Sequence, residues 1–269
     1  MSLSVIIPTY NVENYIGQCL ESIQTWPESE VEIIVVDDHS QDQTATIVED
    51  LKAQQKNIKL FRQPETGGPG MARNRGIQES HGTFLLFLDA DNWMDKSFWD
   101  VWIHNLFPHQ SEWDVVFWEM TIVNDKTITS QRFYHDYILV DPVEILQSSP
   151  YELFYRSLLD VCAIMRRDPA IYFTNYLSFL EDWELWSRLW YHQKRFYFIK
   201  DSLSYYRKQR PDSQTAKSLE RAHLRLSDEI TILSRNLKYI VPGSDPYNRI
   251  IKAISERIQQ LLTIPLHQK

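Results

Sequence analysis

Short apolar runs alternate with segments of helical periodicity through the first third of the chain. The apolar runs cover residues 3–8, 31–36, 58–61 and 83–88, and the helical segments cover residues 12–23, 42–53 and 70–80. Strands that alternate with helices usually build a parallel sheet with helices on both faces. The pattern therefore predicts an α/β fold around a mainly parallel central sheet.

Polar residues follow three of these predicted strands directly. Pro8-Thr9-Tyr10 closes the first strand, Asp37-Asp38 the second and Asp89-Ala90-Asp91 the fourth. Ligands of open α/β sheets bind beyond the carboxyl ends of the strands, so we predict a binding site at this edge. Tyr10 offers a flat face to a nucleobase, and a core tyrosine at a turn is the alternative.

The carboxylate pairs in these positions each allow two interpretations. Asp89 and Asp91 lie one residue apart, where both can reach one hard cation such as Mg²⁺ or Mn²⁺, directly or through a water or a ribose hydroxyl. An acidic turn is the alternative. Asp37 and Asp38 fit acceptors for a base or a ribose hydroxyl, or a cap for the next helix. His39 fits a metal ligand or a solvated loop residue.

Five of the seven glycines fall within residues 67–82. Such a cluster marks a loop whose backbone bends tightly or approaches another group closely. In the helix predicted after this loop, Arg73 and Asn74 are placed to contact phosphate or ribose. A surface helix that leaves both side chains in water is the alternative.

The segment FLEDWELWSRLW, residues 179–190, combines carboxylates with tryptophans on one helical face. Trp183, Trp186 and Trp190 predict a core stripe, and Trp183 alternatively offers an apolar face to a sugar ring. Glu181 and Asp182 fit the start of the helix, where the helix dipole favours carboxylates. The competing interpretation makes Asp182 a general base at the mouth of a pocket.

Charge is distributed unevenly along the chain. Residues 1–95 carry six Lys/Arg against fifteen Asp/Glu, and residues 187–225 carry ten against three. The acidic first third would repel nucleic acid. The basic stretch fits an anionic ligand or peripheral contact with anionic lipid at the inner membrane face, with a solvated charged surface as the alternative.

Membrane spans and disulfides are not expected. No stretch approaches the ~20 apolar residues of a transmembrane helix, and no secretion signal is visible. Cys19 and Cys162 are the two cysteines, too few for a disulfide framework or a cysteine-based zinc site. We therefore expect a cytoplasmic enzyme or binding protein.

Beyond residue 95 the sequence is richer in aromatic residues and its pattern is looser. We predict a helix near residues 95–106, strands near 114–123 and 128–140, and two helices after residue 215 separated by Pro242-Gly243. The expected organisation is a nucleotide-sugar-binding half over residues 1–95, an acceptor-binding half over 96–214 and a C-terminal helical extension over 215–269.

The order and spacing of several motifs resemble the inverting family 2 glycosyltransferases of GT-A fold. The resemblance is strong over residues 3–95, good over 178–215 and weak elsewhere. The motifs that carry it are SVIIPTYN (4–11), VDDHS (36–40), ETGGPGMARNRG (65–76), FLLFLDAD (84–91), EDWELWSRL (181–189) and YYRKQRPDSQT (205–215).

This resemblance implies roles for particular residues. Thr9, Tyr10 and Asp38 would hold the nucleotide base, and Asp89 and Asp91 the metal and the sugar diphosphate, with Asp91 the closer ligand. Asp182 would be the catalytic base. The remaining expected donor contacts are Pro8, Glu13, Gly68, Arg73 and Ala90, and the expected acceptor or diphosphate contacts are Glu181, Trp183, Arg207 and Arg210.

Two positions depart from the family pattern. His39 stands where the family motif has glycine, so the loop or its nucleotide contact is expected to differ. The gap from Tyr206 to Ser213 is one residue longer than usual, which leaves Arg207, Lys208 and Arg210 as competing candidates for the diphosphate.

The function implied is inverting transfer of a sugar from a nucleotide-sugar, with UDP the expected nucleotide, to a glycan or lipid-linked acceptor of a bacterial surface polysaccharide. Mn²⁺ or Mg²⁺ is the expected cofactor, because an acidic pocket repels a diphosphate unless a cation intervenes. The alternatives are a sugar-phosphate nucleotidyltransferase and a non-catalytic binding module of the same fold.

Overall fold

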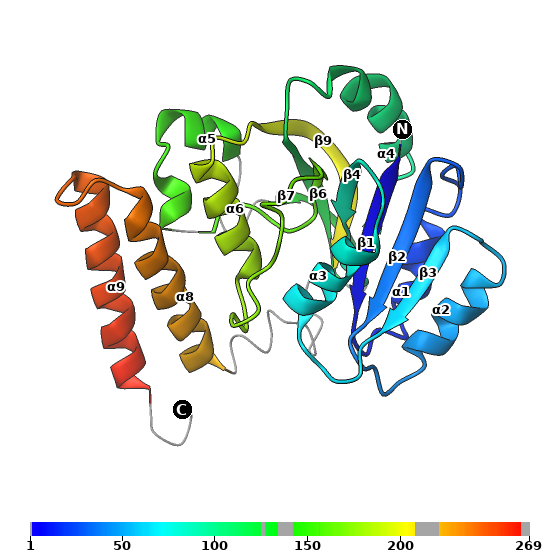
Figure 1. Cartoon of the computed structure of the whole chain (residues 1–269), viewed down its shortest axis with the longest axis horizontal. Coiled ribbons are helices and arrows are strands. Elements are labelled where there is room, and N and C mark those ends of the chain that lie inside the picture. Colours follow the sequence, from blue (N-terminus) through cyan, green and yellow to red (C-terminus); the bar gives the residue numbers. More distant parts are fainter. Residues whose placement is uncertain (1, 125–126, 134–141, 156, 208–220, 265–269) are drawn as a thin grey trace.

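The computed structural model describes residues 2–124, 127–133, 142–155, 157–207 and 221–264 (Figure 1). The strands are β1 Leu3–Thr9, β2 Val31–Asp37, β3 Ile58–Arg62, β4 Phe84–Phe87, β5 Trp93–Met94, β6 Val115–Asn124, β7 Thr127–Phe133, β8 Ile164–Arg166 and β9 Phe196–Arg207. The α-helices are α1 Ile16–Glu21, α2 Thr44–Lys52, α3 Pro69–Glu79, α4 Phe98–Val101, α5 Pro142–Ser148, α6 Glu181–Tyr191, α8 Ala222–Asn236 and α9 Asp245–Thr263. A π-helix, η1 Trp102–Leu106, continues α4, and short 3₁₀ helices are η2 Phe107–His109, η3 Glu152–Phe154 and η4 Leu237–Tyr239.

The described strands form one sheet in the order β3-β2-β1-β4-β8-β6-β9-β5, with β7 paired to β6. The first four of these are parallel, as predicted. Strand β8 is antiparallel to β4 and β6, and β5 is antiparallel to β9. The sheet is therefore mainly parallel, as predicted, and the second half adds short antiparallel pairs around the parallel pairing of β6 with β9.

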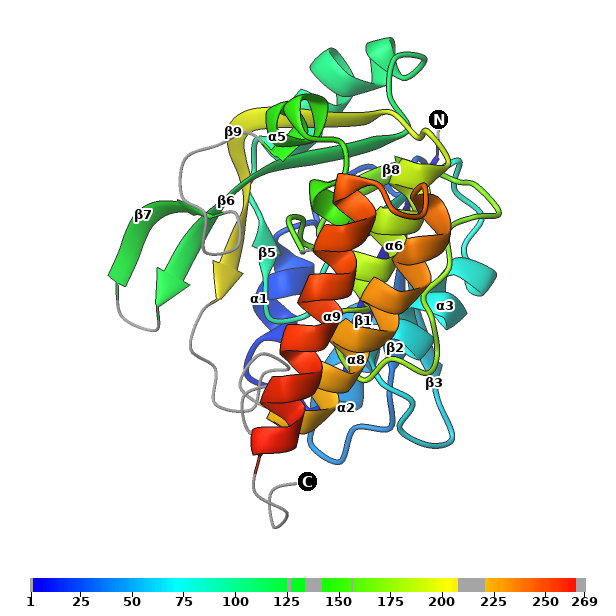
Figure 2. The same cartoon turned by 90° about the vertical axis from the view of Figure 1, so that its left-hand side faces the viewer.

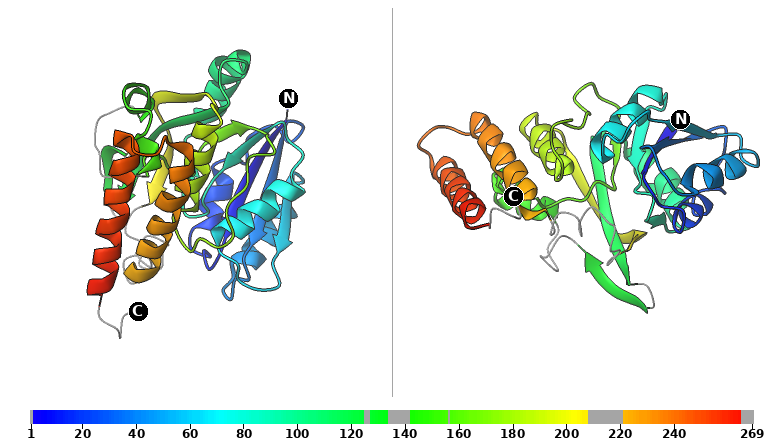
Figure 3. Two further views of the ribbon diagram at one scale, coloured as in Figure 1. Left: turned by 60° about the vertical axis from the view of Figure 1, so that its left-hand side comes forward. Right: turned by 90° about the horizontal axis from the view of Figure 1, so that it is seen from below.

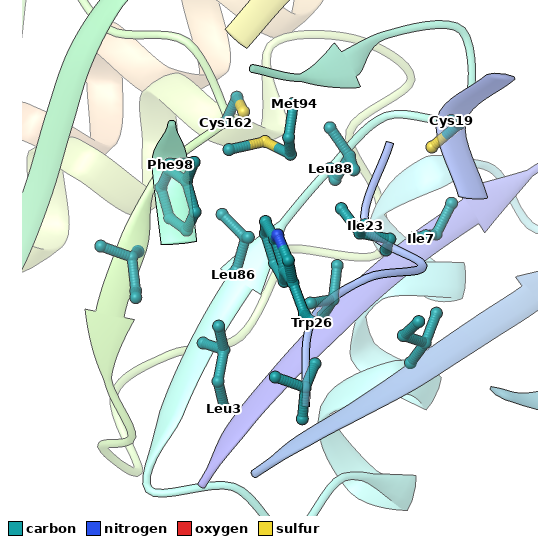
Figure 4. Close-up of a cluster of buried hydrophobic side chains, with 14 of the residues drawn as sticks. Leu3, Ile7, Cys19, Ile23, Trp26, Leu86, Leu88, Met94, Phe98 and Cys162 are labelled. Carbon is teal, nitrogen blue, oxygen red and sulfur yellow. The ribbon is translucent and has the colours of Figure 1, made fainter. Parts of the chain in front are cut away.

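Successive residues of the central strands point to opposite faces of the sheet, and both faces are covered. Val5 and Ile7 belong to one buried cluster, whereas Ile6 belongs to the other. Figure 4 shows part of the first cluster, where Trp26 stacks on Phe98 at 5.2 Å between ring centroids. Burial on both faces explains why these strands are continuous apolar runs.

Glycine allows α3 to pack closely on the second face. A Cβ at Gly76 would lie 2.4 Å from Cγ2 of Ile6, a distance that only a shift of the helix or the strand would relieve. The close approach fixes α3 against β1 and carries the start of that helix to the carboxyl end of the sheet.

Two elements differ from their predictions for identifiable reasons. Helix α1 begins only at Ile16, because a tight turn precedes it, in which the carbonyl of Val12 accepts from the NH groups of both Tyr15 and Ile16. Strand β9 was not predicted, because much of it is exposed and its pairing with β6 shifts register at Glu119. Neither a long apolar run nor strict alternation marks such a strand.

The C-terminal helices pack beside the second half of the sheet. Helices α6, α8 and α9 lie side by side in both views of Figure 3, and α6 and α8 contact each other. The hairpin of β6 and β7 projects from the body of the molecule (Figure 2). The remainder of the strand predicted over residues 128–140 lies outside the described residues, as do Lys208 and Arg210.

Candidate active site

The polar ends of β1 and β2 meet at one edge of the sheet, as predicted. The NH of Asp38 donates to the carbonyl of Thr9 at 2.8 Å. Thr9 is buried, and its hydroxyl donates to the carbonyl of Val36. Tyr10 follows at the rim, where its side chain is 36% exposed, so its ring lies where a base could stack rather than in the core.

The buried carboxylate of Asp38 holds the glycine loop. It accepts hydrogen bonds from the NH groups of Gly67 and Gly68, each at 2.8 Å, and from the side chain of Gln63. Gly68 has φ +85° and precedes α3 directly. Asp38 therefore sets the entry into α3, in addition to the base contact predicted for it.

His39 occupies the left-handed region of backbone space, with φ +66°. That conformation costs a non-glycine L-residue roughly 1–2 kcal/mol, and it explains why glycine is the family residue here. Neighbouring bonds hold the loop: Ser40 Oγ accepts from the NH of Asn11, and Glu13 Oε2 accepts from the NH of Gln43. His39 is exposed, so the loop accommodates its side chain without a clash.

Arg73 joins the DxD segment to the ED motif. Its guanidinium donates to Asp89 Oδ1 at 2.7 Å and to Glu181 Oε1 at 2.5 Å, and it lies over the ring of Phe173. The side chain is 4% exposed. Burial lowers the pKa of Arg73, but Asp89 and Glu181 outweigh burial and raise it. Neither a solvated Arg73 nor an isolated acidic turn describes this arrangement.

Asn74 ties α3 to the loop before α6. Its amide accepts from the NH of Phe173 and donates to the carbonyl of Phe173, both at 2.7 Å, and to Asn175 Oδ1. The alternative of a solvated Asn74 is therefore wrong. Two consecutive side chains of α3 thus reach the second half of the site.

Trp183 belongs to the core. It is 2% exposed, and its indole NH donates to the carbonyl of Leu153. Trp186 is also buried, next to Phe117. The predicted stripe is a packing face, and the predicted contact of Trp183 with a sugar ring is corrected, because no face of its ring is accessible.

Asp182 begins α6 beside Glu181. Its Oδ1 accepts from the NH of Trp183 at 2.7 Å. Burial raises the pKa of Asp182 well above its usual value, and the charges of Glu181 and Asp160 raise it further. Since Arg73 compensates Glu181, the two neighbouring carboxyls have different environments. Divergent environments of this kind mark acid–base pairs in enzymes.

Arg207 brings the end of β9 to the DxD segment. Its side-chain Nε donates to the carbonyl of Asp91 at 3.3 Å, and its backbone NH donates to Oδ1 of Asn92 at 3.0 Å. The guanidinium lies 5.0 Å from the ring of Trp93. Of the three cations predicted as alternatives, Arg207 is the one within the described residues, and it lies next to Asp91.

The carboxylates of Asp89 and Asp91 fit a cation that a diphosphate helps to hold. No group of three His, Cys, Asp or Glu suited to a metal occurs among the described residues. A Mg²⁺-type ion needs only one or two carboxylates when substrate phosphates and waters complete its shell. Asp89 is already engaged by the guanidinium of Arg73.

Four further residues of the site were not predicted. They are Asn92, which anchors Arg207; Asp160, whose charge acts on Asp182; Phe173, under Arg73; and Asp228, which binds the turn before α6. Asn92 follows the DxD motif directly and was the one within reach of motif analysis. The others are far from any motif in sequence.

The chain matches the family model described as Glycosyl transferase family 2 over residues 4–145, more than half of its length. It is a family 2 glycosyltransferase. The poly(ribitol-phosphate) β-N-acetylglucosaminyltransferase TarS of Staphylococcus aureus is 32% identical over 212 residues, which cover 77% of this chain and 35% of TarS. The poly(ribitol-phosphate) β-glucosyltransferase of Bacillus spizizenii is 30% identical over 188 residues, 68% of this chain and 28% of that protein.

Solved structures share the fold. TarS residues 1–349 superpose with a TM-score of 0.69 at 25% identity, covering all of this chain and 77% of that one. A Pyrobaculum calidifontis mannosyltransferase, solved with GDP-Man and Mn²⁺, gives 0.62 at 16% identity, over 95% of this chain and 69% of that one. The fold is thus the α/β fold predicted, a central sheet flanked by helices, and the nucleotidyltransferase alternative is set aside. This chain spans about a third of the length of the curated relatives it matches.

Among the described residues, no helix combines the length and the apolar character needed to cross a membrane.

Proposed function

We propose that this glycosyltransferase moves a sugar from a UDP-sugar to a hydroxyl of a polyol-phosphate polymer, with inversion at the anomeric carbon and Asp182 as base. The observation that carries the proposal is the Arg73 bridge, because it fixes Glu181, the neighbour of Asp182, beside the DxD segment. Donor and base then face one another across a single site.

The donor lies over the carboxyl ends of β1, β2 and β4. Tyr10 stacks on the base, and the loop held by Asp38 borders the nucleoside. Arg207 lies next to Asp91 and stabilises charge on the leaving diphosphate. TarS has been solved with UDP and with UDP-GlcNAc, which supports UDP as the nucleotide here.

Asp91, with Asp89, would hold Mn²⁺ or Mg²⁺ together with the diphosphate. A bound divalent cation would neutralise charge that develops on the departing phosphates. The Mn²⁺ in the mannosyltransferase of the same fold supports this cofactor. Arg73 keeps Asp89 in place through their ion pair.

Asp182 takes the proton from the acceptor hydroxyl as its oxygen attacks the anomeric carbon. Its raised pKa in the ligand-free chain gives a base with strong affinity for a proton, because burial and two neighbouring carboxylates disfavour its charge. Glu181 is bound by Arg73 and serves to orient the start of α6.

The acceptor class follows from the relatives and from charge. Both curated relatives act on poly(ribitol-phosphate), a polyanion. The excess of ten Lys/Arg over three Asp/Glu in residues 187–225 favours a polyanionic acceptor. A cytoplasmic location and contact of this stretch with anionic lipid stay predictions.

Asp182→Asn tests the base. We expect transfer from UDP-sugar to fall by about 10²–10⁴ in kcat, the usual contribution of a positioned general base, with UDP affinity unchanged by calorimetry. Asparagine keeps the size of the side chain and its acceptor for the NH of Trp183. Near-normal turnover of this variant would remove Asp182 from the mechanism.

A further inference from the structure

The turn before the proposed base is bound by a carboxylate from the far C-terminal region. Asp228 lies on α8 and is 7% exposed. Its Oδ2 accepts from the NH groups of Ser178 and Phe179, each at 2.8 Å. Figure 1 shows α8 running beside α6, which begins two residues after Phe179.

The residue between this turn and the helix is strained. Leu180 has φ +59°, and no side chain caps the helix at this position. A left-handed non-glycine residue costs roughly 1–3 kcal/mol and persists only where its surroundings determine it. Asp228 fixes the backbone on one side of Leu180, and Arg73 fixes Glu181 on the other. The direction in which Glu181 and Asp182 leave the turn depends on both anchors.

The hydrogen-bond partners of Asp228 differ from those of two other polar residues on α8, Glu229 and Asn236. Its neighbour Glu229 binds Arg225 and Arg257, and so joins α8 to α9. Asn236, at the other end of α8, donates to the carbonyl of Phe154 and to Ser187. Asp228 alone among these three binds the backbone that precedes the ED motif.

We propose that Asp228 is a positioning residue for Glu181 and Asp182, so that the C-terminal helix pair forms part of the active-site scaffold. This inference rests on the proposed role of Asp182 as base. Residue 228 lies outside the family-model match over residues 4–145. A displacement of about 1 Å at reacting groups lowers rates by as much as ~10²-fold, so loss of this anchor slows the chemical step.

Three variants separate positioning from stability. Asp228→Ala should lower kcat by roughly 10- to 100-fold with the Kd for UDP unchanged, because Asp228 binds the turn before α6 and not the ends of β1, β2 or β4. Asp228→Asn retains an acceptor at the same place and should recover most of kcat. Glu229→Ala is the matched control on the same helix, and it should lower the thermal midpoint without changing kcat.

Hydrogen exchange gives a readout that does not depend on catalysis. The amides of Ser178 and Phe179 should exchange faster in Asp228→Ala than in wild type, and Asp228→Asn should lie between them. If the alanine variant does not fold, the asparagine variant alone still has to show faster exchange at these two amides.

The results distinguish failure of the role proposed for Asp228 from failure of the role proposed for Asp182. Wild-type kcat in Asp228→Ala, an equal loss of kcat in Glu229→Ala, or unchanged exchange at Ser178 and Phe179 would each overturn the inference. An active Asp182→Asn enzyme, with fast exchange at these amides in Asp228→Ala, would instead overturn the role of Asp182 and leave the anchor intact.

Discussion

The proposed donor side of the site, with Asp38 and Asp89, and the proposed base side, with Glu181 and Asp182, are held in place in different ways. Asp38 and Asp89 follow strands buried on both faces, and parallel pairing aligns β1 with β2 and β4. Glu181 and Asp182 instead begin a helix whose first residues follow a left-handed turn. That turn is anchored by Arg73 from α3 and by Asp228 from α8.

This difference predicts that the donor side keeps its geometry after a single substitution better than the base side does. A carboxylate at the end of a buried strand inherits its place from the sheet, whereas a carboxylate after a strained turn depends on a few long-range hydrogen bonds. Arg73 contacts both sides, because it binds Asp89 and Glu181. Its loss should therefore lower the stability of the site more than any other single substitution.

Arg73→Met should have the largest effect on stability. Removing one partner of a buried ion pair leaves uncompensated carboxylates, here Asp89 and Glu181, and costs about 3–5 kcal/mol. The free energy of unfolding from urea titration measures the loss. Hydrogen exchange should show faster opening at the start of α6 than along β4.

Arg75→Met is the matched control, since Arg75 lies on the same helix in an exposed pair with Glu79. Exposed pairs contribute about 0–1 kcal/mol. Equal losses of unfolding free energy in Arg73→Met and Arg75→Met would contradict the division between the donor side and the base side. Equally fast hydrogen exchange along β4 and at the start of α6 in Arg73→Met would also contradict it.

Asp182→Asn should increase stability at neutral pH. Burial raises the pKa of Asp182 in the folded state, so its stabilising contribution is complete below the unfolded pKa and is lost as pH rises through the folded pKa. Asparagine removes that penalty, and we expect a gain of about 1 kcal/mol near pH 7. The gain should shrink toward about pH 3, below the unfolded pKa, where the wild-type carboxyl is mostly protonated in both states. Urea titrations at both pH values measure it, and a gain independent of pH would argue against a charged Asp182 as its cause.

His39→Gly should give the smallest effect. Relief of the left-handed conformation at φ +66° gains roughly 1–2 kcal/mol, and the extra freedom of glycine in the unfolded chain removes about 0.5–1 kcal/mol. A net stabilisation of a few tenths to 1 kcal/mol should appear in the thermal midpoint. Gln193→Gly, at φ +58° beyond the end of α6, is the control; stabilisation there but not at residue 39 would mean that His39 makes compensating contacts.

The sequence predicted the parts of the molecule whose cause is local. Apolar runs located β1 to β4, and the polar residues after β1 and β2 meet at one edge of the sheet, as predicted. The helix of the ED motif was also predicted within two residues at each end, because carboxylates and a tryptophan stripe mark it.

The remaining parts depend on contacts across the fold. Strand β9 opens with the short apolar run Phe196–Ile199, but its remaining residues carry no clear pattern, and its extent follows only from its pairing with β6 and β5. The partners of Arg73 lie 16 and 108 residues away, and those of Asp228 lie 49 and 50 residues away. No local pattern encodes such separations, so solvated side chains remained open alternatives for Arg73 and Asn74.

Calorimetric titration of UDP with and without Mn²⁺, in the wild type and in Asp91→Asn, tests the central claim most directly. We predict that UDP binds the wild type, that binding weakens strongly without Mn²⁺, and that Asp91→Asn abolishes the metal-dependent part. Absence of UDP binding by the folded wild type in the presence of Mn²⁺, or metal-dependent binding unchanged in Asp91→Asn, would contradict a UDP-sugar site at the ends of these strands.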